Sequence, residues 1–297
     1  MDASLPQTGG PMQGGTATGR PEDSRGLSWA ALDRRGFLGY RAWDFTWRSL
    51  GHRYGRHFLA RVVLRHPLRA LQGYATFRQL TNPPRVEKGA LCLFRGSSQD
   101  FLREAAGGEP GRFLLALGFC QKKTVSPADP EPCPAGRFNH DCALLDGTPA
   151  EATAACAACD VRQLAEHALA AGASLYLMTA AQEITRDVLA PALENARFRQ
   201  TLMLLCPMSV QAVLAPMIVC RLPGFIIGYN AGYCADYAEW LRADGGDKPK
   251  QTSLHATHLA RALQILDTLA AERRSLGRLE PNAWGRQGSV YMPQLCE

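Results

Sequence analysis

The chain has 297 residues, of which 46% are hydrophobic and 20% are charged. This length allows one large domain or two smaller ones, with enough apolar residues for a sizeable core. The composition excludes a wholly disordered chain, because such chains are poor in apolar residues. It also excludes a collagen-like chain, because the glycines lack a period of three.

The net charge of +6 is unevenly distributed along the chain. Residues 29–88 contain twelve arginines and lysines against three acidic residues, so this segment carries +9 and the remainder carries −3. A basic segment ahead of a mildly acidic body indicates an anionic partner for that segment.

The pattern predicts three parts. Residues 1–28 are rich in Gly, Pro and Thr and are expected to form a disordered tail. In residues 29–85, aromatic side chains alternate with arginines and apolar residues recur at helical spacing, which predicts a basic amphipathic helical arm. Residues 86–297 are predicted to form an α/β domain that contains a cysteine-rich segment, residues 120–159.

The elements of the predicted domain alternate along the chain. Residues 90–94 form a candidate strand, and an apolar run follows at residues 111–118. Beyond the cysteine-rich segment, helices and strands are expected in turn, and Thr179 with Gln182 resembles a capping box. Tight connections between these elements predict a three-layer α/β fold with a mainly parallel sheet. The expected elements are a helix at 161–171, a strand at 174–179, a helix from 180 to about 197, a strand at 201–205, a helix at 209–220, a strand at 225–228 and a helix at 253–274.

Residues 203–220 carry no charge over eighteen positions, a length that is compatible with a membrane span. Pro207 and Pro216 interrupt this run, and its two halves are typical of a strand followed by a helix. We therefore expect a buried strand–helix unit of a parallel sheet and no transmembrane span. Residues 1–28 also lack the apolar run of a secretory signal, so the expected location is the cytoplasm, with the arm allowing peripheral contact with a membrane.

The cysteines carry the sharpest chemical signal. Cys156 and Cys159 form a Cys-x-x-Cys pair, whose two thiolates can bind one metal ion from a single turn. Four thiolates suit either a tetrahedral zinc ion or an iron–sulfur cluster. A redox dithiol and a set of packed buried thiols remain alternatives, because spacing alone does not separate them. The candidate ligands are Cys120, Cys133, Cys142, Cys156 and Cys159.

The order of these elements resembles the DUF116 family of uncharacterised, cysteine-rich prokaryotic proteins. The resemblance covers about residues 113–237 and excludes the basic arm. It implies an iron–sulfur site but supplies no reaction. The matching elements are Leu114-Leu115 leading to Cys120, Cys133-Pro134-Ala135, the Cys156–Cys159 pair, the strand at 174–179, Leu205-Cys206 and Gly232-Tyr233-Cys234.

The sequence departs from that family at one position. Arg162 stands where the family carries the third cysteine of its cluster. The fourth ligand is then either Cys120 or Cys142, and His140 is a further candidate because it lies close to two cysteines in the sequence.

Cys206 and Cys234 form a possible second thiol site. Cys206 follows a predicted strand and Cys234 follows the next one. Ligands of open α/β sheets bind beyond the carboxyl ends of the strands, so the two cysteines can lie near each other and near Thr179. Buried, inert thiols are the alternative.

The arm, residues 29–80, has the pattern of a segment that contacts a protein partner or an anionic membrane surface. Nucleic acid is disfavoured, because lysine is nearly absent and Trp43, Phe45 and Trp47 favour burial. The expected function is that of an iron–sulfur protein with a redox or accessory role in a metabolic pathway. The alternatives are a structural zinc protein that binds a partner or a membrane, and a thiol enzyme that uses Cys206 or Cys234.

Overall fold

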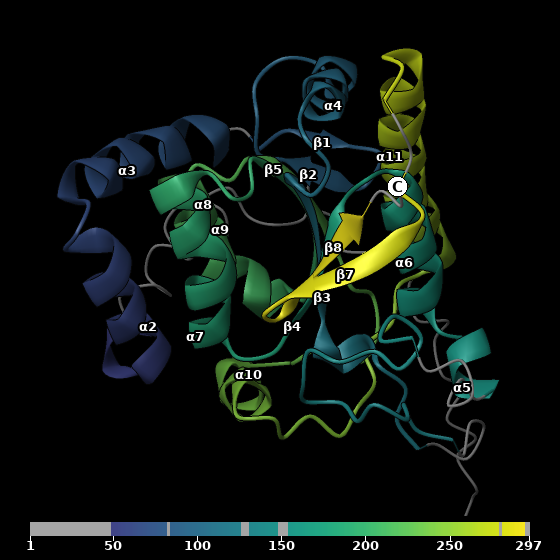
Figure 1. Cartoon of the computed structure of the whole chain (residues 1–297). Coiled ribbons are helices and arrows are strands. Elements are labelled where there is room, and N and C mark those ends of the chain that lie inside the picture. Colours follow the sequence, from purple (N-terminus) through teal and green to yellow (C-terminus); the bar gives the residue numbers. More distant parts are fainter. Residues whose placement is uncertain (1–48, 82–83, 126–130, 148–153, 279–280, 295–297) are drawn as a thin grey trace, which may run out of the picture.

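The computed structural model describes residues 49–81, 84–125, 131–147, 154–278 and 281–294 (Figure 1). The predicted tail, residues 1–28, and the first part of the arm, residues 29–48, lie outside these ranges.

Four parallel strands form the centre of an eight-stranded sheet. They are β3 (Phe113–Gly118), β4 (Ser174–Met178), β5 (Gln200–Leu205) and β6 (Gly224–Gly228). Their residues are almost all buried, as expected for apolar strands that are covered on both faces.

Both edges of the sheet are antiparallel, so the sheet is mixed and only its centre matches the predicted parallel arrangement. On one side, β2 (Ala90–Cys92) pairs with β6 and with β1 (Val86–Glu87). On the other side, β8 (Val290–Gln294) pairs with β4 and with β7 (Ala283–Gln287). Short hairpin turns join each edge pair, and such turns can connect only antiparallel strands.

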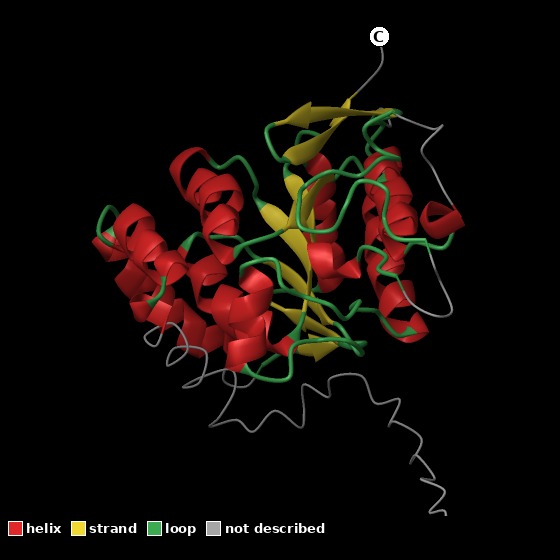
Figure 2. Cartoon of the chain, turned by 90° about the horizontal axis from the view of Figure 1, so that it is seen from below, coloured by secondary structure: helices red, strands yellow, loops and turns green. Residues whose placement is uncertain are grey.

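Helices cover both faces of this sheet, and the predicted α/β class is confirmed (Figure 2). One face carries α4 (Ser98–Gly107), α6 (Asp160–Ala170) and α11 (Ala256–Ser275), and α11 packs on both of the others. The opposite face carries α7 (Ala181–Ile184), a π-helical turn (Thr185–Leu189), α8 (Ala190–Asn195) and α9 (Pro207–Val219).

The described part of the arm packs against this second helical layer. It consists of a short turn (Ser49–Gly51), α2 (Arg53–Phe58), a π-helical turn (Leu59–Val63) and α3 (Pro67–Thr81). Its buried residues belong to the same core as the sheet, and α3 lies so close to α9 that a Cβ atom at Gly73 would come within 2.6 Å of Val219. The buried hydrophobic residues of the arm are Tyr54, Phe58, Val62 and Phe77.

The predicted buried strand–helix unit at residues 203–220 corresponds to the end of β5 followed by α9. Nearly all of its residues are buried in the protein core. In the part of the chain that the structure describes, no helix combines the length and the apolar character needed to cross a bilayer.

The connections between the parallel strands reverse direction at one point. The chain runs from β3 to its neighbour β4, then returns past β3 to β5 and continues to β6. The segments that leave β3 and β5 therefore depart toward opposite faces of the sheet. In open α/β sheets this arrangement leaves a crevice at the carboxyl ends of the two strands, where ligands bind.

The prediction of a capping box at Thr179 is wrong. The N-cap of α7 is Ala180, and the side chain of Thr179 instead donates a hydrogen bond to the carboxylate of Glu183. The backbone N–H of Ala181, at the start of the helix, donates a hydrogen bond over 2.6 Å to Oδ1 of Asp244, which belongs to another helix.

Candidate functional site

A pocket of about 70 Å³ lies where β3 and β5 part, and we call it the switch pocket. Its floor comes from the residues that end or follow the four parallel strands. Its wall comes from α10 (Tyr237–Asp244) and the loops on either side of that helix. The residues that bear polar or sulfur groups in its lining include Cys120, Thr179, Cys206, Ser209, Tyr229, Tyr233, Cys234, Trp240, Asp244, Lys248 and Thr252.

Cys206 occupies the N-cap position of α9. Its sulfur accepts a hydrogen bond from the backbone N–H of Ser209 over 3.3 Å and lies 3.1 Å from Ser209 Oγ. Trp240 Nε1 donates to the same Ser209 Oγ over 3.1 Å. Because an indole N–H can only donate, it uses an oxygen lone pair and leaves the hydroxyl proton of Ser209 for the sulfur of Cys206.

Cys234 faces Cys206 across the pocket, so the two cysteines that the sequence placed at successive strand ends are brought together. A hydrogen bond from the Cys234 thiol lowers the pKa of Cys206, and Ser209 lowers it further. The same contact raises the pKa of Cys234, with burial as a second cause. Both shifts make Cys206 the more acidic thiol of the pair.

Gly232 determines how the chain carries Cys234 into the pocket. Its φ is +64°, and a Cβ atom there would lie 1.8 Å from the carbonyl oxygen of Gln251. Only glycine fits both the left-handed conformation and this close approach. This explains, in physical terms, the glycine of the Gly232-Tyr233-Cys234 element.

Two buried polar groups complete the switch pocket. Tyr229 Oη accepts a hydrogen bond from Gly118 N over 2.9 Å and donates to Gln121 Oε1 over 3.0 Å. Lys248, which is 3% exposed, forms an ion pair with Glu239 over 3.1 Å, and this pairing contributes to the lowered pKa of Glu239.

A second, smaller cavity of about 20 Å³ lies in the cysteine-rich segment, and we call it the loop cavity. Four of the five predicted ligands line it, and these are Cys133, Cys142, Cys156 and Cys159. The fifth, Cys120, lines the switch pocket instead, where burial raises its pKa to about 11.

The local structure accounts for the positions of the paired cysteines. Cys156 lies in the single turn α5 (Ala154–Ala157), and Cys159 is the N-cap of α6. Burial raises the pKa of Cys159 to about 11 and also raises the pKa of Cys142. The nine cysteines in the described part of the chain are all free thiols. Within these ranges, no three Cys, His, Asp or Glu side chains are gathered closely enough to ligate a metal ion.

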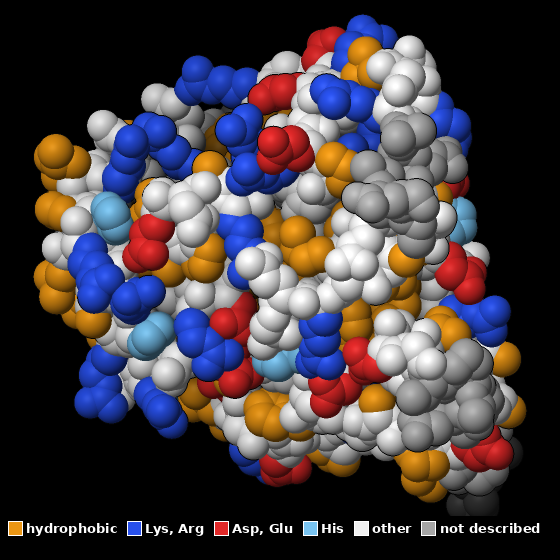
Figure 3. Space-filling view, in the orientation of Figure 1, with side chains coloured by type: hydrophobic (Ala, Val, Ile, Leu, Met, Phe, Trp, Pro, Cys, Tyr) orange, Lys and Arg blue, Asp and Glu red, His pale blue; other side chains and the backbone are white. Residues whose placement is uncertain are grey.

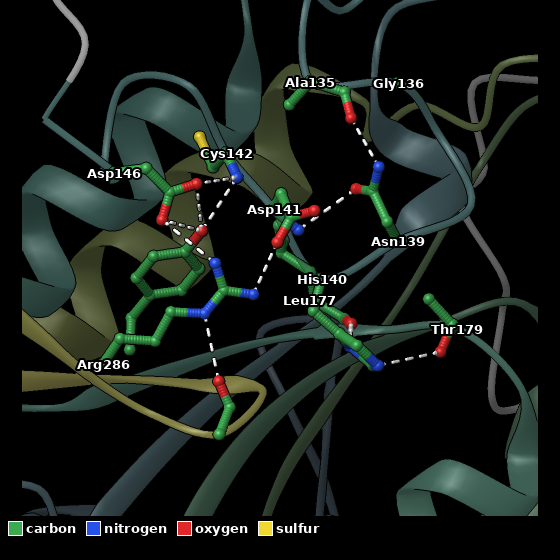
Figure 4. A network of polar contacts seen from close by, with 12 residues as sticks. Ala135, Gly136, Asn139, His140, Asp141, Cys142, Asp146, Leu177, Thr179 and Arg286 are labelled. Atoms are coloured by element: carbon green, nitrogen blue, oxygen red, sulfur yellow. Dashed lines mark hydrogen bonds and ion pairs between the residues drawn. The ribbon is translucent and has the colours of Figure 1, made fainter.

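Polar contacts to the carboxyl-terminal hairpin hold the segment around Cys142 (Figure 4). Arg286 of β7 donates to Asp141 over 2.5 Å and to Asp146 over 3.2 Å. Tyr291 of β8 donates to Asp146 over 2.9 Å and accepts from the backbone N–H of Cys142 over 2.8 Å. The position of Cys142 therefore depends on the last two strands of the sheet.

His140 fastens the same segment to the end of β4 (Figure 4). Its Nδ1 lies 2.7 Å from the carbonyl oxygen of Leu177, and its Nε2 lies 3.3 Å from Glu183 and 3.4 Å from Thr179. Both ring nitrogens face partners on the sheet side of the segment, and His140 does not line the loop cavity. The geometry favours a tether over the ligand role considered from the sequence.

A buried ammonium group lies beside the loop cysteines. Lys122 is 2% exposed, and its Nζ donates to the carbonyl oxygens of Gly136 and Asn139 over 3.2 and 3.1 Å and to the side-chain oxygen of Asn139. Burial lowers its pKa, while the nearby Cys133 and Cys142 oppose that change. A thiolate in the loop cavity would therefore face a positive charge at close range.

Arg162 also lines the loop cavity, at the position of the departure from the resembled family. Its guanidinium is paired with Glu166, one turn along α6, over 2.9 Å. The resemblance expects a cysteine at position 162, but the chain has an ion-paired arginine there. Cys142 also lines the cavity and offers a sulfur in its place.

The two cavities are neighbours. Leu177 lines the loop cavity, and the next two residues of the chain, Met178 and Thr179, line the switch pocket. Likewise, Cys120 lines the switch pocket, and Lys122 lines the loop cavity. The segments that leave β3 and β4 thus separate the two groups of cysteines.

Sequence reasoning missed several residues of both cavities. Trp240 lies on a helix that was not expected, although Asp236 and Glu239 form the capping pattern that announces its start. Lys122, Lys248, Arg286 and Tyr291 carried no local signal, because each acts on partners nine or more residues away.

The fold and the two cavities define a doubly wound α/β protein that has a thiol-lined crevice at its switch point and a second cysteine group beside it. No family model, curated protein or solved structure matches this chain. The resemblance to the DUF116 family therefore rests on the order of the sequence elements alone.

Proposed function

We propose that the chain is an iron–sulfur protein whose cluster is bound at the loop cavity and which has a redox or accessory role in metabolism. The single observation that carries this proposal is the convergence of Cys133, Cys142, Cys156 and Cys159 on one cavity. Four cysteine thiolates are the usual ligand set of such a cluster, and one-electron transfer is the chemistry that a bound cluster supplies.

The chemistry of the donor set suits this group, and the cavity of about 20 Å³ would have to widen to admit a cluster. The thiols are half-buried and lie against apolar side chains, including Ala143, Ala155, Val161 and Leu177, which partly shield them from water. The ammonium of Lys122 offsets part of the negative charge that four thiolates bring into a buried place. Since the sulfurs are not gathered as ligands in this structure, binding would draw the loop inward and add to its stability.

We propose Cys142, not Cys120, as the fourth ligand. Cys142 shares the loop cavity with the other three cysteines, whereas Cys120 lies in the switch pocket near Thr252 and Cys206. The hairpin contacts to Asp146 and to the backbone of Cys142 support this choice, because they hold the segment at the cavity.

Replacement of single cysteines tests the ligand set. In protein purified without oxygen, Cys156→Ser and Cys142→Ser should each remove most of the bound metal. Cys120→Ser and Cys92→Ser, the latter a buried thiol of β2, should retain it. Metal analysis of the four variants is the measurement, with thermal unfolding to show that each is folded. Loss of metal in Cys120→Ser with retention in Cys142→Ser would contradict the proposed set. Zinc in place of iron and sulfide would favour the structural zinc alternative.

For the arm, we propose docking on an anionic membrane surface. Leu68, Leu71 and Tyr74 recur at helical spacing on α3, Leu64 lies in the turn that precedes it, and the three leucines are about 70% exposed. Residues 49–81 contain six arginines and no Asp or Glu, and basic side chains surround the apolar ones at this edge of the molecule (Figure 3). An apolar stripe flanked by arginines is typical of helices that lie in the membrane interface. This charge favours an anionic lipid surface over a protein partner of mixed charge.

A further inference from the structure

We propose that Cys206 and Cys234 in the switch pocket form a reversible dithiol–disulfide couple that exchanges with small organic disulfides. This inference goes beyond the proposed cluster, because neither cysteine lines the loop cavity. Its basis is the meeting of two thiols in a pocket at the point of the sheet where ligands of such folds bind.

The surroundings of Cys206 are those of an attacking thiolate. Its sulfur accepts the Ser209 N–H at the start of α9, a helix of thirteen residues, and the dipole of the helix favours a negative charge there. The hydroxyl of Ser209 accepts a hydrogen bond from Trp240 and lies 3.1 Å from the Cys206 sulfur, to which it can donate its proton. Hydrogen bonds to the charged form of a thiol lower its pKa, which raises the fraction of the nucleophile at neutral pH.

Cys234 has the position of the resolving thiol. It lines the same pocket as Cys206, and a contact between the two side chains shifts the pKa of both, so a local rearrangement would bring the sulfurs to S–S bonding distance. The Gly232 turn, held against the backbone of Gln251, fixes the approach of this residue. The contact with Cys206 raises the pKa of Cys234, which suits a thiol that reacts second.

The exchange balances in two steps. The Cys206 thiolate attacks one sulfur of a disulfide R–S–S–R, which forms a mixed disulfide and releases RS⁻. The thiol of Cys234 then loses its proton to that thiolate and attacks the sulfur of Cys206, which releases the second RS⁻. The two protein thiols are oxidised to a disulfide, the substrate is reduced to two thiols, and no other reactant is needed.

The lining of the pocket suits a small substrate of this class. Phe119, Ile184 and Tyr233 supply apolar and aromatic surface, and Lys248, which is paired with Glu239, also lies in the lining. The titratable or charged groups that surround Cys206 are Cys120, Tyr229, Tyr233, Cys234, Glu239, Asp244 and Lys248.

The test uses the full-length protein, purified anaerobically and treated with oxidised glutathione, with modification sites mapped by mass spectrometry. We expect wild type to form a Cys206–Cys234 disulfide. We expect Cys234→Ser to accumulate glutathione on Cys206, and Cys206→Ser to leave Cys234 unmodified. Alkylation of Cys206 in the untreated protein should have its pH midpoint below about 8.5, the value of an ordinary thiol. Ser209→Ala should raise that midpoint and slow alkylation at pH 7 severalfold.

Three results would contradict the proposal that Cys206 and Cys234 form a dithiol–disulfide couple. They are an unmodified Cys206 in folded Cys234→Ser, a disulfide that joins a different pair, and an alkylation midpoint of Cys206 at or above the ordinary value. Metal content separates this test from that of the cluster. Cys206→Ser should leave bound metal unchanged, and Cys156→Ser should leave the Cys206–Cys234 disulfide unchanged.

Discussion

Replacing Lys122 with Met should destabilise the protein by about 2–3 kcal/mol, because it removes a buried charged donor that makes three hydrogen bonds. The methionine side chain fills similar space, so the loss is that of the ammonium and its three hydrogen bonds to Gly136 and Asn139. These bonds fasten the cysteine-bearing segment 131–147 to the residues that leave β3. The midpoint of urea unfolding measures the change, and protease cleavage within residues 131–147 should accelerate.

The matched control is Lys250→Met, which removes the same charge from an exposed position. A surface substitution of this kind changes stability by about 0.5 kcal/mol or less. Equal unfolding midpoints for the two variants would show that the ammonium of Lys122 does not hold the segment.

Replacing Leu64 and Leu68 together with Ser should weaken binding to vesicles of mixed neutral and anionic lipid by about tenfold or more. Both side chains are about 70% exposed, so the double variant should remain folded. Burial of a leucine in an apolar environment contributes about 1.5–3 kcal/mol, and each 1.4 kcal/mol corresponds to a factor of ten. Cosedimentation with vesicles measures the binding, which should also fall as salt is raised.

Val125 and Leu276 provide the control, because they are exposed apolar residues outside the arm. The double variant Val125→Ser/Leu276→Ser should bind the same vesicles as well as wild type does. Equal loss in both double variants, or equal binding of wild type to purely neutral vesicles, would count against membrane docking through the arm.

The centre of the fold was predictable because the parallel strands are short, mostly apolar runs separated by segments of helical length. The observed strands β4, β5 and β6 agree with the predicted ones to within a residue or so. In the antiparallel edges, β2 lies within the candidate strand at residues 90–94, whereas β1, β7 and β8 were missed because they are short or partly polar. The turn of the β7–β8 hairpin nevertheless had a signal, since Gly288-Ser289 is a two-residue turn and Gly288 has a φ of +63°.

The grouping of the cysteines was only partly predictable. Their spacing indicated a shared site, but sequence order could not separate Cys120 from the four that line the loop cavity. That separation depends on where the chain goes after β3, since Cys120 stays at the switch point and Lys122 already lies beside the loop. The contacts of Arg286 and Tyr291 with Asp146 join residues about 140 positions apart, and no local pattern announces them.

Iron, zinc and acid-labile sulfide, measured together with the absorption spectrum of the anaerobically purified protein, test the central claim most directly. We expect iron and sulfide in similar amounts, a visible absorption band, and resistance to protease across residues 121–158 that is lost when the metal is removed. A wild-type protein that contains neither iron nor zinc, and whose cysteine-rich segment is equally resistant to protease, would contradict the claim. The four cysteines of the loop cavity would then be packed thiols.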